Sequence, residues 1–126
     1  MNPTRTAFSA LAACATLLAL AAAAHAERFT TRNHTVDVVT LADGLEHPWG
    51  LAFLPNGDLL FTERVSGLKY LAAGESKAAP VSGLPEALTE GQAGYFGVTL
   101  DPDFENNRTV YIAYAQGTEK DNGTAV

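Results

Sequence analysis

Hydrophobic and polar residues alternate with a period of two along most of the chain after Glu27, and no segment keeps helical spacing for three turns. Segment 34–41 is typical, because Val36 and Val38 share one face and β-branched residues are frequent. The same pattern predicts further strands over residues 49–54, 59–64, 68–71, 95–100 and 109–115. Turn signals separate these strands, the strongest being Pro55-Asn56-Gly57-Asp58. We therefore expect an all-β fold.

The spacing of the turns limits the all-β architectures that the chain can adopt. Turns about every 10 residues are typical of sandwiches, barrels and propeller blades. A sandwich of this size usually has about seven strands, whereas a propeller closes with ~4–8 four-stranded blades. The pattern therefore favours a β-propeller, of which residues 27–126 are the first one to two blades, and predicts an amino-terminal fragment. Residues 72–89 are expected to be loose, with at most one helical turn at 85–88, and residues 116–126 to lack a further element.

Residues 1–26 have the features of a secretory signal peptide. Arg5 is followed by an uncharged Ala- and Leu-rich run, and Ala24-His25-Ala26 has the small-x-small pattern of a cleavage site. A membrane anchor is disfavoured because no basic stop-transfer cluster follows. A lipoprotein cleavage at Cys14, after Leu11-Ala12-Ala13, is the weaker alternative. Cleavage after Ala26 predicts a secreted or periplasmic protein with no membrane span.

Charge and cysteine content exclude several classes of partner and site. All 14 acidic residues, but only seven of the eight basic ones, lie after residue 26. So acidic a chain is unsuited to nucleic acid or anionic lipid, which are held mainly by Lys and Arg. Cys14 is the only cysteine, so the mature chain has no disulfide, thiolate nucleophile or cysteine metal site.

The clearest candidate for a binding residue is Gln92, in the segment Gly91-Gln92-Ala93-Gly94 that precedes the strand 95–100. Glycines on both sides allow a tight turn or a close backbone approach. The Gln92 amide, with two donors and an acceptor, would then lie at the end of a sheet. A plain polar turn residue is the alternative interpretation.

Other polar residues are better explained without catalysis. His47 precedes Pro48, where an extended backbone is expected, and it is assigned a loop or packing role; His34 should be solvated. Asp101, Asp103 and Glu105 alternate like a calcium loop but lack the Gly and Glu that an EF-hand needs. We expect a turn there, with no metal site. Glu63 and Arg64 are expected to form a surface or inter-blade charge pair.

Three segments together carry a family resemblance: 44–64 with H-P-W and L-x-T-E-R, Val81-Ser82-Gly83-Leu84-Pro85, and 91–104 with G-Q-x-G and D-P-D-F. In this order and spacing the region from Val36 to Ala115 resembles the amino-terminal part of the glucose/sorbosone dehydrogenase family. These proteins are soluble quinoproteins, aldose sugar dehydrogenases that depend on pyrroloquinoline quinone (PQQ). One departure is that Ala93, Tyr95 and Phe96 stand where the family commonly has Gly and two aliphatic residues, which affects the expected geometry of the turn.

The resemblance implies a six-bladed propeller that holds PQQ and calcium and oxidises an aldose at its anomeric carbon to a lactone. Electrons would pass to an acceptor such as a cytochrome or a quinone. Gln92 matches the glutamine that lies beside the sugar in the family. The family's catalytic histidine, cofactor-binding residues and calcium ligands fall in later blades, so no catalytic residue is assigned here and the fragment is expected to be inactive. A secreted NHL-like binding propeller is the alternative, and a propeller lactonase a weaker one.

Overall fold

The computed structural model describes residues 26–126. The predicted signal peptide and the Cys14 alternative lie outside the described residues, except for Ala26. The described part is mostly β-structure, with nine strands and one short helix. The strands are β1 (Ala26–Thr30), β2 (Thr35–Val39), β3 (Pro48–Phe53), β4 (Leu59–Glu63), β5 (Gly67–Leu71), β6 (Ala79–Pro80), β7 (Tyr95–Leu100), β8 (Val110–Thr118) and β9 (Asp121–Ala125), and the helix is α1 (Phe104–Asn107).

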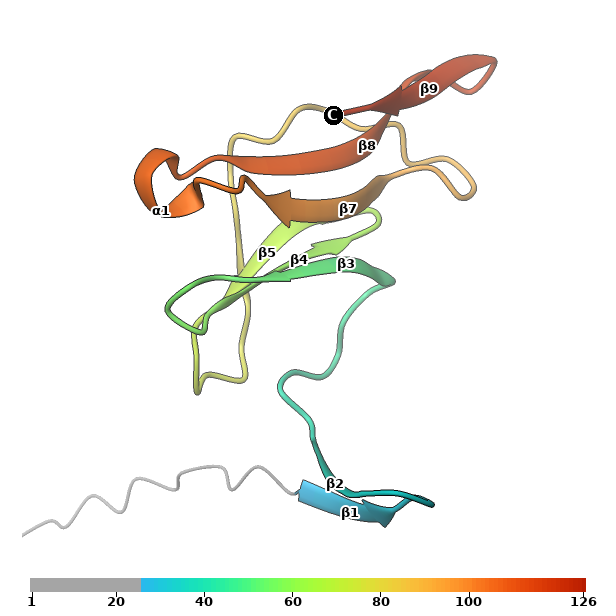
Figure 1. Ribbon diagram of the computed structural model, residues 1–126. Coiled ribbons are helices and arrows are strands. Elements are labelled where there is room, and N and C mark those ends of the chain that lie inside the picture. The colour runs from blue at the N-terminus through green and yellow to red at the C-terminus, as the bar shows by residue number, and fades with distance from the viewer. Residues whose placement is uncertain (1–25) are drawn as a thin grey trace, which may run out of the picture.

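These strands form three antiparallel sheets in chain order: the hairpin β1-β2, the four-stranded sheet β3-β4-β5-β6 and the three-stranded sheet β7-β8-β9. The two larger sheets each run as a meander, as the alternation of residues predicts. They lie one above the other, with β7 and β8 over β3, β4 and β5 (Figure 1).

The turn between β3 and β4 forms where the Pro-Asn-Gly-Asp signal predicts it. The Gly57 N–H donates to the Leu54 carbonyl at 2.9 Å, and the Leu54 N–H donates to the Asp58 carbonyl at 2.8 Å. Gly57 has a φ of 89°, which a glycine adopts without steric cost. The turn therefore sets the register in which Phe53 pairs with Leu59.

The core lies between the two larger sheets. Leu60 from β4, Leu68 from β5 and Val98 from β7 are buried and in mutual contact. Partly buried apolar residues, including Ala52 and Ile112, pack around them. Because side chains alternate along a strand, the residues between them, such as Phe61, face the opposite side of the first sheet, away from β7.

Three strands form where no strand was predicted. β1 pairs with β2 although it overlaps the predicted signal boundary. β6 is only two residues long and pairs with Lys69 and Tyr70 of β5. The expectation that the chain has no further element after Gln116 is wrong, because β9 pairs with β8 from Thr118 back to Tyr114. In each case backbone hydrogen bonding to an existing strand edge supplies stability that the side-chain pattern does not reveal.

Two other local differences are smaller. Residues 85–88 form no helical turn. Distant contacts hold this segment as irregular chain: the Tyr95 hydroxyl donates to the Pro85 carbonyl at 2.6 Å, and the Leu88 N–H donates to the Ala115 carbonyl at 2.9 Å. The polar corner after β7 contains the single helical turn α1, which ends at Arg108 in a left-handed conformation.

Candidate functional site

The glycine-framed turn lies at the end of the second sheet, immediately before β7. A hydrogen bond from the Ala93 N–H to the Glu90 carbonyl, at 2.9 Å, closes the turn. Gly91, with a φ of 58°, takes the left-handed position of this turn. Gln92 is exposed at the tip. Ala93 has no positive φ, so the substitution of Ala for the family's glycine does not disturb the backbone here.

Gly94 fixes the exit from the turn through close packing. A Cβ at this position would lie 2.0 Å from the Arg64 carbonyl oxygen and 2.6 Å from the Arg64 Cγ, and its φ is 150°. Side chains other than glycine are excluded by both the space and the backbone angle. The glycine thus brings the turn directly against the residue that follows β4.

Glu63 and Arg64 do not pair with each other, so that part of the sequence prediction is wrong. Glu63 is buried, with 7% of its surface exposed; its carboxylate accepts the Glu46 N–H at 2.8 Å and the Ser66 hydroxyl, and lies 3.4 Å from the Lys69 Nζ. Arg64 instead donates from Nη1 to the carbonyls of Gly91 at 2.6 Å and Ala93 at 3.0 Å. Side chains of consecutive residues in a strand point to opposite faces of the sheet. This alternation separates the charges of Glu63 and Arg64.

Local environment determines the ionisation of Glu63. Burial by itself would raise its pKa, but the Ser66 hydroxyl, the Glu46 N–H and the Lys69 charge outweigh burial and lower the pKa below the ordinary value. Glu63 is therefore a structural carboxylate that holds the loop before β3.

Thr62 joins the two sheets through its hydroxyl, a role that the sequence did not indicate. The side chain is fully buried. Its Oγ1 accepts the Gly50 N–H from β3 at 3.0 Å and donates to the Phe96 carbonyl of β7. The Thr-Glu-Arg segment of the L-x-T-E-R motif thus contacts the neighbouring sheet, the loop before β3 and the Gln92 turn in succession.

His47 is not in the extended conformation expected before a proline. It has a φ of 53°, in the left-handed region where His is among the more tolerated non-glycine residues. Its carbonyl accepts the Arg64 N–H at 3.1 Å, and this contact, together with the bond to the Glu46 N–H, holds the loop in a bend that local preference would avoid. The predicted loop role is confirmed. His34 is exposed in the β1-β2 hairpin, also as predicted.

The Asp101–Glu105 corner lies at the far end of the second sheet, away from Gln92. The Asp101 carboxylate accepts the Asp103 N–H at 2.8 Å, the Asn107 amide at 2.9 Å and the Tyr111 hydroxyl at 2.6 Å. The Tyr111 hydroxyl, followed by the Asp103 N–H and the Asn107 amide, lowers the pKa of Asp101. The predicted turn is confirmed, but of its two aspartates only Asp101 accepts a backbone N–H, whereas the Asp103 carboxylate accepts the Asn106 side-chain amide at 2.6 Å.

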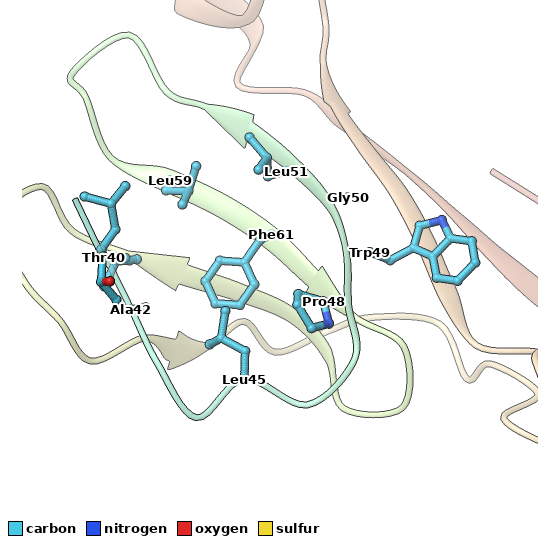
Figure 2. A pocket seen from close by; sticks show the side chains of 11 residues that line it. Thr40, Ala42, Leu45, Pro48, Trp49, Gly50, Leu51, Leu59 and Phe61 are labelled. Atoms are coloured by element: carbon cyan, nitrogen blue, oxygen red, sulfur yellow. The ribbon is translucent and has the colours of Figure 1, made fainter. Parts of the chain in front are cut away.

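An apolar hollow of about 390 Å³ lies on the side of the first sheet that faces away from β7. Leu51, Leu59 and Phe61 from the sheet face the linker residues Leu41 and Leu45 across it, as Figure 2 shows in part. Trp49 points the other way, toward the second sheet (Figure 2), where its ring centroid lies 5.7 Å from that of Phe96. Such an apolar lining has few groups to hydrogen-bond a sugar.

Within residues 26–126 no three His, Cys, Asp or Glu side chains are grouped as metal ligands would be. Arg64, which lies next to the Gln92 turn, already donates to two carbonyls. The described residues thus provide a polar amide on a turn whose flanking carbonyls are hydrogen-bonded to Arg64. No helix in this part of the chain has the length and apolarity to cross a membrane.

Two packed antiparallel sheets with a glycine-framed polar turn at one end place the described residues in the class of mostly β proteins. The Glucose / Sorbosone dehydrogenase family matches residues 45–126, and the chain belongs to this family.

Named relatives agree with this assignment. The chain is 44% identical over 94 residues to "Aldose sugar dehydrogenase YliI" of Escherichia coli, covering 73% of this chain and 25% of that protein. The crystal structure of the soluble aldose sugar dehydrogenase from Escherichia coli in the apo-form matches with a TM-score of 0.62 and 41% identity, covering 68% of this chain and 25% of that one. The PQQ-bound aldose sugar dehydrogenase from Streptomyces coelicolor matches with a TM-score of 0.59 and 29% identity, covering 80% and 28%. The chain thus spans about a quarter of the length of these relatives.

Proposed function

We propose that this segment is the amino-terminal part of a PQQ-dependent aldose sugar dehydrogenase, in which Gln92 hydrogen-bonds the sugar. The observation that carries the proposal is the exposed Gln92 amide on a turn closed by the Ala93–Glu90 bond and held by Arg64. A primary amide can donate to one sugar hydroxyl and accept from another at the same time. Because the Gln92 turn is held in place before binding, the protein loses less conformational entropy when the sugar binds.

The overall reaction proposed is oxidation of the anomeric C–OH of an aldose to a lactone, with the electrons passed on to an acceptor such as a cytochrome or a quinone. In this family PQQ supplies the oxidising chemistry. Following the family resemblance, in which the cofactor-binding residues, the calcium ligands and the catalytic histidine belong to later blades, we propose that these groups lie outside the segment 26–126. Gln92 binds and orients the sugar, and this segment without the remainder should not oxidise it.

We also propose that the two larger sheets are consecutive blades of a six-bladed propeller. Support comes from the outer face of the first sheet, where Leu51 and Phe53 are 59% and 62% exposed. Apolar sheet faces are normally covered by another layer. In a closed six-bladed ring, the last of the other four blades would cover this face.

We place the protein in the periplasm, after cleavage following Ala26. The support is the small-x-small site at the end of an uncharged Ala-rich run. The amino-terminal residue of the exported protein measures this directly: Glu27 is the expected start, and a lipid-modified Cys14 would contradict it.

The test of function uses the full-length protein with PQQ and calcium added, and measures dye-linked oxidation of a panel of aldoses. We expect quinone-dependent turnover, and a KM for the sugar roughly ten-fold higher in Gln92→Ala. Glu105→Gln, a change of an exposed side chain on α1 at the opposite end of the sheet, is the matched control and should leave KM unchanged. Sugar binding without turnover for any aldose would refute the dehydrogenase and favour a binding propeller.

A further inference from the structure

Arg64 connects the end of the first sheet to the turn that presents Gln92. Its Nη1 donates to the carbonyls of Gly91 at 2.6 Å and Ala93 at 3.0 Å. These two carbonyls belong to the residues immediately before and after Gln92. The guanidinium therefore holds the backbone on both sides of the candidate sugar-binding residue.

The backbone of Arg64 is hydrogen-bonded as well as its side chain. Its N–H donates to the His47 carbonyl at 3.1 Å, and its carbonyl accepts the Tyr95 N–H at 2.8 Å. Gly94 packs against the same carbonyl, so closely that a Cβ there would lie 2.0 Å away. Arg64 thus lies directly after β4, with its backbone hydrogen-bonded to the loop before β3 and to the start of β7.

The chemistry of the arginine suits this role. Guanidinium is always charged, and a charged donor makes a stronger bond to a carbonyl than a neutral one does. Exposed loop tips are otherwise among the most mobile parts of a fold. A turn of four residues that contains two glycines has large conformational freedom when nothing holds it.

We propose that Arg64 is a positioning residue for sugar binding: it holds the two carbonyls that flank Gln92, so that the Gln92 amide faces the sugar in one orientation. This inference rests on the function proposed above for Gln92. Arg64 acts through Gln92 and does not itself contact the sugar.

The first test is a double-mutant cycle in the full-length protein with PQQ and calcium. Arg64→Ala should raise the KM for the aldose roughly ten-fold, with the affinity for PQQ and the melting temperature close to wild type. In a Gln92→Ala background the same change should raise KM less than about two-fold, because the residue through which Arg64 acts is gone. Equal effects in both backgrounds would refute the proposal. Arg64→Lys, which keeps the charge but loses the planar fork, should recover part of the loss.

The second test measures the turn itself and does not depend on activity. Hydrogen exchange at the Ala93 amide, which closes the turn onto Glu90, should be roughly ten-fold faster in Arg64→Ala than in wild type. Arg108→Ala is the matched control, since this exposed arginine lies at the opposite end of the sheet over the Phe104 ring, and it should leave that amide unchanged. Unchanged exchange in Arg64→Ala would overturn the proposal, and if Arg64→Ala does not fold, Arg64→Lys and Arg64→Gln take its place.

A wild-type protein that shows no quinone-dependent oxidation refutes the proposed function, whereas this exchange measurement still decides whether Arg64 holds the turn.

Discussion

Glu63 and Arg64 are adjacent in sequence but stabilise different parts of the molecule. Glu63 turns inward and holds the loop before β3 through the Glu46 N–H. Arg64 turns toward the second sheet and holds the Gln92 turn. The side chain of a strand residue and that of its neighbour point to opposite sides, so one Glu-Arg pair can bind two separate loops.

The carboxylate of Glu63 predicts a pH dependence of stability. Its pKa is lowered in the folded protein, so the unfolded chain binds this proton more readily. The stabilisation is therefore complete above the ordinary carboxyl range near pH ~4.3 and is lost as the pH falls through that range toward the lowered value. Glu63→Gln in the full-length protein should lose about 1–3 kcal/mol of unfolding free energy at pH 7, and the deficit should shrink below about pH 4.

Urea unfolding at a series of pH values measures this effect. Glu105→Gln changes an exposed carboxylate on α1 and should shift the free energy of unfolding by less than about 0.5 kcal/mol at any of these pH values. A Glu63→Gln deficit that stays constant down to pH 3 would show that the ionised form is not what stabilises the fold.

At the scale of elements, the two large sheets approach each other closely at Gly50 of β3. A Cβ on Gly50 would lie 3.0 Å from the Gly97 Cα, the Phe96 carbonyl oxygen and the Val98 nitrogen of β7. The Gly50 N–H also donates to the Thr62 hydroxyl, which in turn donates to the Phe96 carbonyl. The absence of a side chain at Gly50 thus permits both the close packing and the hydrogen-bonded bridge.

Gly50→Ala is expected to destabilise the full-length protein by about 1–3 kcal/mol, because backbone atoms of β7 would have to move to admit one methyl group. The matched control is Gly97→Ala on the facing strand, where nothing lies within 4 Å of the added Cβ. Gly97→Ala should change the free energy of unfolding by less than about 0.5 kcal/mol. Chemical unfolding of the two variants measures the difference, and equal effects would contradict the assigned packing.

The strands that the residue pattern predicts are those with alternating apolar residues and clear turn signals. β3, β4, β5 and β7 were predicted within one or two residues for this reason. β6 has the sequence Ala79-Pro80 and β9 runs through Asp121-Asn122-Gly123, residue types with low strand preference. They form because an existing strand edge offers unpaired N–H and C=O groups, which no local pattern encodes.

At the scale of the whole molecule, much apolar surface remains uncovered. Trp49, Leu51 and Phe53 of β3 are each more than half exposed, and all ten strand residues of the β1-β2 hairpin are exposed. The hairpin lies apart from the two larger sheets, joined to them by residues 40–47 (Figure 1). An isolated hairpin has marginal stability in water, so both features predict further packing partners.

Residues 27–126 produced alone are therefore expected to self-associate at micromolar concentration, because exposed apolar surface and free strand edges promote aggregation. A Leu51→Lys/Phe53→Lys variant should be markedly less associated in sedimentation velocity or light scattering. Val65→Lys, at an exposed position on the β4-β5 turn, serves as the control and should associate as wild type does. A monomeric wild-type segment with a sharp melting transition would show that it is an independent domain.

The amino-acid sequence by itself determined the all-β class, the main strands, the tight turns and the nomination of Gln92, because alternation and turn residues act within a few neighbouring positions. The tertiary structure alone decided what holds Gln92 in place. Arg64 lies 28 positions before Gln92, and its pairing with the turn instead of with Glu63 depends on how the two sheets pack. The left-handed His47 and the requirement for Gly94 have the same origin, since both follow from contacts with the backbone of Arg64.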